Sequence, residues 1–340
     1  MNITTIGLDL AKNVFQVHCV DGVGNVVLKK KLRRAEMLTF FSGLPPCQVG
    51  IEACATAHHW AREIATLGHD VRLMPPSYVK AYVRRQKNDA ADAEAICEAA
   101  SRPTMRFVPV KSAEQQSVLV LHRSRELLVR QRTMLINAIR GHCAEFGIIV
   151  AQGARRACEL VEKIRQGEAS ELPDLARSAL LVLANQLDAL AAEIYALERQ
   201  LQVWHRKDQA SQRLATIPGV GIITATALAA SIPDPSMFRS GREFAAFLGL
   251  VPRQNSSGGK ERLGRISKMG NGYLRKLLVV GATSVIRRAR TSTSASATWI
   301  NALLERRPAR VVNVAMANKN ARIAWAVLAR GEVYRPHVPA

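Results

Sequence analysis

The chain has 340 residues, of which 48% are hydrophobic and 22% are charged, a composition that excludes an intrinsically disordered protein. Its 48 lysines and arginines against 27 acids leave a net charge of +21. No stretch approaches the roughly 18 consecutive apolar residues of a membrane span, and no signal peptide opens the chain. We therefore expect a cytoplasmic protein with no membrane partner.

The predicted elements of the N-terminal third alternate between strands and helices. In order, they are strands at 3–10, 14–20 and 23–33, a short helix near 35–43, a strand at 47–53, a helix at 56–67, a strand at 70–75 and helical segments at 77–85 and 89–102. The first three strands predict an antiparallel meander. The βββαβαβ order predicts an α/β domain of the RNase-H-like (RuvC-like) class over residues 1–110.

The next region, residues 111–208, has the pattern of two long helices. A basic helix begins near Ser112, and residues 147–172 connect it to a second helix between Pro173 and Arg206. Apolar residues of the second helix alternate spacings of three and four, the seam of a coiled coil: Leu180, Leu183, Leu187, Leu190, Ile194, Leu197, Leu201 and Trp204. The seam can close within one chain, as a helical hairpin, or between chains.

The last region, residues 209–340, is predicted to be mainly α-helical, with helices at 242–250, 271–290 and 311–330 and polar loops at 252–264 and 291–298. Residues 241–340 contain 18 lysines and arginines and four acids, which is two-thirds of the net charge. These charges would repel one another unless a polyanion neutralised them. Nucleic acid is therefore the expected partner, ahead of a membrane surface.

Near the start of this region, the sequence IPGVG at 217–221 precedes TATALAA. This pattern fits a helix–hairpin–helix, in which the backbone N–H groups of a turn containing Gly219 and Gly221 meet a phosphate at a helix N-terminus. It fits equally well a tight turn between packed helices. Both interpretations remain open from the sequence.

Four carboxylates are candidates for metal ligands. Asp9 and Glu52 lie at or near the ends of the apolar strands IGLDL and VGIEA, where a carboxylate costs free energy unless it is paired or binds a metal. Asp89 and Asp92 are three residues apart, which places both on one face of a helix. If the two strands pair, these acids can form a site for Mg²⁺, which activates water or a hydroxyl and stabilises a leaving oxygen. Ordinary solvated surface acids are the alternative.

The polar loop at 252–264 holds two adjacent serines, Ser256 and Ser257, followed by Gly258 and Gly259. Either hydroxyl could attack phosphorus, but no histidine lies nearby in the sequence to activate it. The composition predicts a flexible loop that contacts phosphates. The basic residues expected to bind nucleic acid there and in the following helix are Arg253, Lys260, Arg262, Arg265, Lys268, Arg275 and Lys276.

Six motifs, in this order, closely resemble one family: GLDLAK (7–12), GIEAC (50–54), KNDAADA (87–93), IPGVG (217–221), LGLVPRQNSSGG (248–259) and ISKMGNGYLRKLL (266–278). The family is that of the DEDD transposases of bacterial insertion sequences of the one-hundred-and-ten type, which includes the bridge-RNA-guided recombinases. The resemblance covers nearly the whole chain. The stretch EACATAHHW lacks a glycine that many members have after the glutamate, and in this it is similar to the subgroup of the eleven-hundred-and-eleven type.

The resemblance implies a role for each candidate residue. Asp9, Glu52, Asp89 and Asp92 take the DEDD positions and would bind Mg²⁺, and the nucleophile falls on Ser257, with Ser256 as the adjacent competitor. Members join this serine covalently to DNA, and the serine domain of one subunit completes the carboxylate site of another, in a dimer or tetramer. They also use a structured noncoding RNA that pairs with donor and target DNA.

We therefore expect a transposase that cleaves and rejoins DNA by Mg²⁺-assisted transesterification, with domains at 1–110, 111–208 and 209–340. One alternative is a RuvC-like nuclease, such as a junction resolvase, that uses the four acids and water. Another is a non-catalytic nucleic-acid-binding protein with a degenerate RuvC-like core. The presence of all four acids argues against the second alternative.

Overall fold

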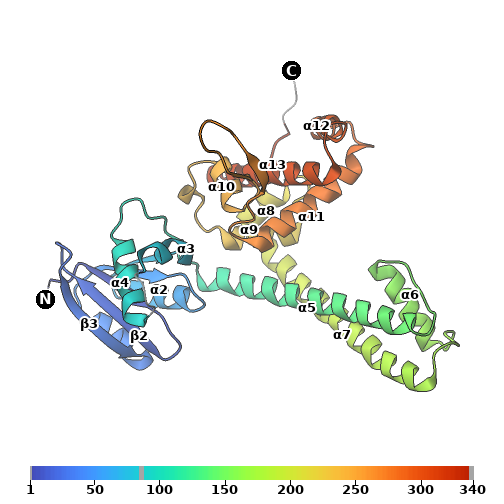
Figure 1. The fold of residues 1–340 in the computed structure, drawn as a ribbon, viewed down its shortest axis with the longest axis horizontal. Helices are drawn as coiled ribbons and strands as arrows, with labels where there is room; N and C mark the ends of the chain where they lie inside the picture. Colours follow the sequence, from blue (N-terminus) through green and yellow to red (C-terminus); the bar gives the residue numbers. More distant parts are fainter. Residues whose placement is uncertain (1, 84–87, 337–340) are drawn as a thin grey trace. The chain divides into compact units, whose positions relative to one another are not determined.

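The structure is a computed structural model that describes residues 2–83 and 88–336 (Figure 1). The chain divides into two compact units, which we describe separately. The first comprises Met1–Gln116 with Ala230–Arg239, and the second comprises Ser117–Ala229 with Ser240–Ala340.

The first unit is built on a five-stranded sheet with the order β3-β2-β1-β4-β5. The first three strands are antiparallel neighbours, as predicted, whereas β4 pairs in parallel with both β1 and β5. The predicted meander is therefore confirmed, and the strands that end at Asp9 and Glu52 are adjacent. The strands are β1 (Thr5–Asp9), β2 (Val14–Val20), β3 (Val26–Arg33), β4 (Gln48–Glu52) and β5 (Asp70–Met74).

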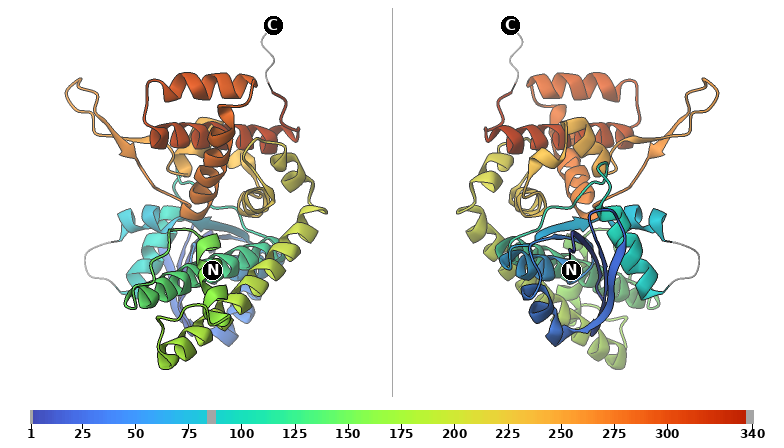
Figure 2. Two further views of the ribbon diagram at one scale, coloured as in Figure 1. Left: turned by 90° about the vertical axis from the view of Figure 1, so that its right-hand side faces the viewer. Right: turned by 90° about the vertical axis from the view of Figure 1, so that its left-hand side faces the viewer.

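Helices cover both faces of this sheet (Figures 1 and 2). Ile6 and Leu8 alternate along β1 with Gly7 and Asp9, so the two pairs face opposite sides. Ile6 and Leu8 belong to the core with α1 (Met37–Ser42) and α2 (Ala57–Thr66), while α3 (Pro76–Val79) and α4 (Asp89–Ala100) pack on the other face. Short 3₁₀ turns occupy Arg34–Glu36 and Lys80–Tyr82. The end of the helical segment predicted at 77–85 lies outside the described residues.

Two long helices of 32 residues each follow, α5 (Ala113–Ala144) and α7 (Asp174–His205), and all of α5 after its first four residues belongs to the second unit. The predicted connection contains a further amphipathic helix, α6 (Ala154–Arg165). The seam of α7 is buried or half-buried along its whole length, and its N-terminal half packs with residues of α5 and α6 in one hydrophobic cluster. Arg125 of α5 also pairs with Glu198 of α7 at 2.6 Å. Part of the seam therefore closes within one chain.

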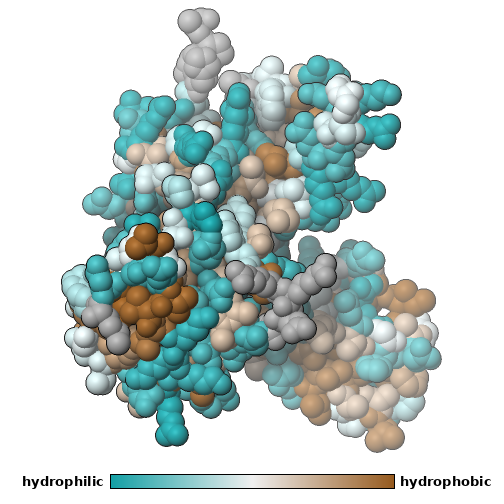
Figure 3. Space-filling view, turned by 60° about the vertical axis from the view of Figure 1, so that its left-hand side comes forward, coloured by the Kyte–Doolittle hydropathy of each residue, from teal (hydrophilic) through white to brown (hydrophobic). Residues whose placement is uncertain are grey.

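Helix α7 is long and apolar enough, by length and composition, to cross a membrane, but only 28% of its most apolar window is buried in the protein. A helix that packs along a single coiled-coil seam buries two residues in every seven, which is close to this fraction. The remaining faces expose isolated apolar side chains such as Leu175 and Val182. The face drawn in Figure 3 is largely hydrophilic, with scattered hydrophobic areas. The pattern is that of a helix packed along one side.

The C-terminal region is mainly helical, as predicted, but both predicted loops contain regular structure. The loop predicted at 291–298 includes the first turn of α12, which begins at Ala295. Residues 252–264, predicted as a flexible loop, belong to a β-hairpin of β6 (Pro252–Gln254) and β7 (Leu263–Ile266). The helices are α8 (Gln209–Ala215), α9 (Ile222–Ser231), α10 (Gly241–Phe247), α11 (Gly272–Ala289), α12 (Ala295–Leu304) and α13 (Ala309–Arg330), with a 3₁₀ turn at Pro235–Met237.

A buried histidine ties α5 to the helices of this region. His122 is 1% exposed, and its Nδ1 and Nε2 lie 3.0 Å from the Tyr273 hydroxyl and 3.1 Å from the Thr226 hydroxyl. Because Thr226 donates its own proton to the Ile222 carbonyl, it can only accept from Nε2–H, which leaves Nδ1 to accept from Tyr273. This is the Nε2–H tautomer of the neutral imidazole, the form that burial favours.

Burial, with a smaller contribution from Arg125, lowers the pKa of His122 from 6.5 to about 4. Below pH 6.5 the unfolded chain binds a proton on His122 that the folded protein does not bind. The free energy of unfolding therefore falls as the pH drops from 6.5 toward 4. We expect a loss of about 3 kcal/mol across this window. Urea unfolding at pH 7 and pH 4.5 tests this, with His122→Gln as reference. If the free energy of unfolding depends equally on pH in both proteins, the lowered pKa of His122 does not cause the loss of stability.

Candidate functional site

Three of the four predicted acids meet at one end of the sheet. Carboxylate oxygens of Asp9, Asp89 and Asp92 all lie within 4.8 Å of one another. Asp9 ends β1, and the other two occupy the first turn of α4. Asp9 and Asp92 are half-buried and Asp89 is exposed. The cluster is therefore open to solvent on one side and held by regular structure on the other.

Two glycines allow α4 to approach the sheet closely enough to form this cluster. A Cβ at Gly7 would lie 2.5 Å from the Cys97 nitrogen, and closer still to the Ala93 carbonyl oxygen. A Cβ at Gly50 would lie 2.6 Å from the Ala100 Cβ. No side chain fits at either position without displacing the helix. The glycines of GLDLAK and GIEAC therefore set the distance between strand and helix.

The start of α4 is fixed by a residue that the sequence analysis did not single out. Asn88 caps the helix, and its Oδ1 accepts a hydrogen bond from the Ala91 nitrogen at 2.8 Å. Asn is among the preferred N-cap residues, so an asparagine directly before Asp89 indicates in the sequence that a helix begins there. The positive end of the helix dipole also favours the two first-turn carboxylates. Lys87, which opens the KNDAADA motif, lies outside the described residues.

Glu52 ends β4, the parallel neighbour of β1. The paired residues Leu8 and Ile51 immediately precede Asp9 and Glu52, so the same register puts these acids in neighbouring positions at the carboxyl edge of the sheet. In the described part of the chain, Glu52 does not belong to the group that lies within 4.8 Å. The structure thus brings three acids together and places the fourth on the adjoining strand.

The chemistry of this donor set fits a divalent cation. Carboxylate oxygens are the ligands that Mg²⁺ and Ca²⁺ prefer. Three carboxylates at such distances repel one another by about 1 kcal/mol per pair even in water, which a bound cation would reverse. Asp9, Asp89 and Asp92 are therefore the residues that would hold a metal ion, with Glu52 at the margin.

A row of polar side chains extends from Asp9 across the sheet. Asp9 lies opposite Gln16 of β2, and Gln16 lies opposite Lys31 of β3. Opposed residues share a face, so all three project on the side that α4 covers. Gln16 is only 8% exposed, and Lys31 is exposed. Sequence alone did not single out Gln16 or Lys31, because the row depends on strand register.

The two serines lie in the β6–β7 hairpin. Ser257 and Lys260 form a β-bridge around Gly258 and Gly259, whose φ angles are 56° and 77°. Positive φ at both central positions indicates a type I′ turn, for which Gly-Gly is well suited. Figure 2 shows this hairpin extending away from the helices of its own unit. Ser257 therefore directly precedes a tight turn at the tip of a projecting hairpin.

Only one of the two serine hydroxyls has a hydrogen-bond partner in the described residues. Ser256 Oγ accepts a hydrogen bond from the Arg262 nitrogen at 3.2 Å across the hairpin. Within the range 2–83 and 88–336, Ser257 Oγ makes no such bond, and its residue is exposed. The geometry thus separates the residues: Ser256 stabilises the hairpin, whereas the Ser257 hydroxyl is accessible.

The base of the hairpin is held by close backbone contacts. Gly249 (φ 68°) and Gly270 (φ 66°) lie against Met269 and Phe247, respectively, with no space for a Cβ. Arg275 Nη1 donates to the Leu248 and Met269 carbonyl oxygens at 2.9 and 2.8 Å. Arg275, predicted to bind nucleic acid, therefore clamps the two segments that lead into and out of the hairpin.

The other predicted basic residues are placed as follows. Lys276 pairs with Glu126 at 3.2 Å, and Lys268 adopts a left-handed φ of 56° just after β7. The exposed residues along the hairpin are Arg253, Lys260, Arg262 and Arg265. Nucleic-acid binding by this set stays a prediction.

The IPGVG segment forms the turn between α8 and α9. Gly219 (φ 84°) packs directly on α11, where its Cβ would lie 2.7 Å from Val285 Cγ2 and 2.8 Å from the Gly281 carbonyl oxygen. Close packing therefore accounts for Gly219 without any phosphate. Gly221 has open space around it and borders a pocket of about 660 Å³ that is also lined by Arg125 and Lys276. Phosphate binding at Gly221 stays a prediction.

Known families and relatives match both halves of this arrangement. Residues 6–147 match the DEDD transposase family of the IS110 type, and residues 211–297 match the transposase IS116/IS110/IS902 family. A probable family 20 transposase of Pseudomonas aeruginosa is 54% identical over 99% of this chain and 100% of its own length. The chain belongs to the IS110 family of transposases. It is an insertion-sequence transposase.

Two other relatives are transposases of named insertion sequences. The transposase of insertion sequence element IS1328 from Yersinia enterocolitica is 43% identical over 98% of this chain and 99% of its own length. That of IS1111A from Coxiella burnetii is 42% identical over 98% and 92%. Transposases act on DNA, and the DEDD family generally uses a divalent metal, in agreement with the acid cluster of this transposase.

The contact at Gly7 yields a test of the site's geometry. Gly7→Ala should lower the free energy of unfolding by about 1–3 kcal/mol, because the methyl group overpacks the boundary between β1 and α4. It should also weaken Mn²⁺ binding, since displacing α4 moves Asp89 and Asp92 away from Asp9. Urea denaturation and Mn²⁺ titration by electron paramagnetic resonance measure the two effects. Gly22→Ala, whose Cβ has an ordinary 3.7 Å contact, is the control. Unchanged Mn²⁺ affinity in Gly7→Ala would contradict the proposed geometry.

Proposed function

We propose that this transposase excises and inserts its element by transesterification, with Ser257 as the nucleophile and Asp9, Glu52, Asp89 and Asp92 as the Mg²⁺-binding acids. The supporting observation for the metal site is the acid cluster between β1 and α4. The supporting observation for the nucleophile is the accessible hydroxyl of Ser257 beside a tight Gly-Gly turn.

In the cleavage step, Ser257 Oγ attacks a phosphorus atom of the DNA backbone. A bond between Oγ and phosphorus forms, the bond from phosphorus to one sugar oxygen breaks, the serine proton passes to solvent or a base, and the leaving oxygen takes up a proton. Rejoining reverses these changes with a different sugar hydroxyl. Each step exchanges one ester for another and requires no external energy source. Bound Mg²⁺ would stabilise charge on the phosphate and the leaving oxygen.

The acids and the serine belong to different compact units of the chain. We propose that a complete site forms when the two units meet, and that the serine unit can come from another subunit of a dimer or tetramer. Self-association through α7 would use exposed apolar side chains outside its seam, such as Val182 and Tyr195, because the seam itself is buried or half-buried within one chain. The IPGVG turn, as a helix–hairpin–helix, would contact the DNA backbone through Gly221.

A recombination assay on donor and target DNA tests the roles of the residues. Ser257→Ala and Asp9→Asn should each reduce recombination at least about a thousandfold, since each removes a reacting or metal-binding group. Ser256→Ala is the matched control. It should cost little, because it removes one hydrogen bond worth about 1 kcal/mol within the hairpin.

Each other outcome would identify a different mechanism. Strand cleavage that persists in Ser257→Ala but requires Asp9 would indicate a nuclease that uses water, as a junction resolvase does. Recovery of DNA covalently bound to Ser256 would show that Ser256, and not Ser257, is the nucleophile. Binding without any Mg²⁺-dependent cleavage in the wild-type protein would indicate a non-catalytic nucleic-acid-binding protein.

We also propose that a structured noncoding RNA from the element guides this transposase in the cytoplasm. The net charge of +21 supports a second polyanion besides DNA. Purifying the protein from cells that contain the whole element and sequencing the bound RNA tests this. We expect one dominant RNA from the element's own noncoding region, whereas recovery of only ribosomal and transfer RNA would contradict guidance.

A further inference from the structure

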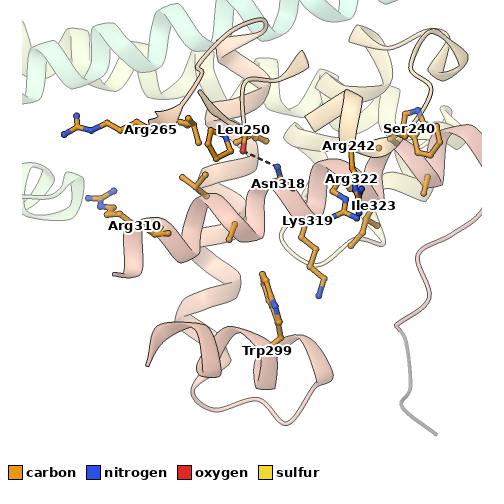
Figure 4. Close-up of a pocket in the computed structure, with 18 of the residues that line it drawn as sticks. Ser240, Arg242, Leu250, Arg265, Trp299, Arg310, Asn318, Lys319, Arg322 and Ile323 are labelled. Carbon is orange, nitrogen blue, oxygen red and sulfur yellow. Dashed lines mark hydrogen bonds between the residues drawn. The ribbon is translucent and has the colours of Figure 1, made fainter. Parts of the chain in front are cut away.

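An open groove of about 1480 Å³ lies in the second unit, beside the base of the hairpin (Figure 4). It is lined by residues of α10, α12 and α13 and by Pro252, Gly264 and Ile266 of the hairpin. Asn318 of α13 donates to the Leu250 carbonyl oxygen at 3.1 Å and so attaches the groove to the segment that leads into β6. Two of the sequence motifs contribute Leu250, Pro252 and Ile266 to this groove, whereas its α12 and α13 residues belong to none of them.

The charges along the groove are all of one sign. Among the described residues that line it, there is no aspartate or glutamate. Figure 4 shows Arg265 and Arg310 toward one end and Arg242 and Arg322 toward the other. Arg310 and Arg322 are twelve residues apart on α13, which corresponds to roughly 18 Å along the helix axis. An anionic ligand that follows this groove would therefore meet cations at both ends.

The rest of the lining is aromatic and apolar. Trp299 of α12 and Trp325 of α13 line the groove together with aliphatic side chains such as Val314 and Ile323. Trp299 is half-buried, and Lys319 Nζ lies 4.5 Å from the centroid of its ring. A rigid duplex presents only its phosphates and groove edges, whereas an unpaired strand can place the flat faces of its bases on aromatic rings.

We propose that this groove binds unpaired bases of the DNA strand that Ser257 attacks, with Trp299 as a stacking surface and the arginines at either end as phosphate contacts. The inference rests on the proposed function for its choice of DNA, because the hairpin that carries Ser257 forms one wall of the groove. Stacked bases rise by about 3.4 Å, so the groove accommodates several nucleotides.

Fluorescence anisotropy with labelled oligonucleotides tests the groove in the full-length protein. The probes are a short oligothymidylate, an oligouridylate of the same length and a duplex. Trp299→Ala should weaken oligothymidylate binding about tenfold, as expected for the loss of one stacked base. Trp299→Phe should stay within about threefold of wild type, since phenylalanine keeps an aromatic face. Duplex binding should change little in either variant.

Arg322→Ala provides a second test, because Arg322 is exposed and its truncation removes no core packing. It should weaken oligothymidylate binding and flatten its salt dependence. Arg330→Ala is the matched control, since Arg330 lies on the same helix outside the groove and is also exposed. Circular dichroism melts of all variants establish that each is folded.

Three results would overturn the inference. The first is oligothymidylate binding that is unchanged in both Trp299→Ala and Arg322→Ala. The second is tighter, Trp299-dependent binding of oligouridylate, which would make the groove an RNA site. The third is an effect of Trp299→Ala on self-association in sedimentation experiments with none on oligonucleotides, which would make it a protein contact. Since binding needs no strand cleavage, these results are separate from failure of the recombination assay.

Discussion

The acid site depends on how closely one helix lies against the sheet. With hydrogen atoms in place of side chains at Gly7 and Gly50, α4 rests directly on β1 and β4, and this contact sets the distance from Asp9 to Asp89 and Asp92. The opposite face of the same strands is filled by Ile6 and Leu8. The large side chains on one face of β1 therefore stabilise the core. The missing side chain of Gly7 on the other face lets α4 bring its two aspartates close to Asp9.

Much of the first unit could be predicted because its strands alternate or are uniformly apolar and its helices have clear boundaries. The position of Asp9 at a strand end followed from that pattern. That Glu52 would stand beside Asp9 but outside the closest trio did not follow, because it depends on parallel pairing and side-chain placement. Gln16 and Lys31 were missed for a related reason, since only the register of β1, β2 and β3 aligns them with Asp9.

The hairpin shows the opposite failure, in which a local signal was present and overlooked. Gly258 and Gly259 between two short segments are a strong hairpin signal, but the flanking residues are polar and exposed and show no alternation of hydrophobicity. The clamp formed by Arg275 and the groove around Trp299 could not be predicted at all. Both are assembled from segments that lie far apart in the chain and meet only in the folded unit.

The acid trio has a further consequence for the folding of the first unit. A cation held by Asp9, Asp89 and Asp92 would act as a reversible cross-link, closing a loop of about 80 residues that contains most of the sheet. Because an unfolded chain cannot hold the three carboxylates together, binding energy would add to folding energy. The concentration of free divalent metal would then regulate how long the domain resists unfolding and proteolysis, as well as how fast it reacts.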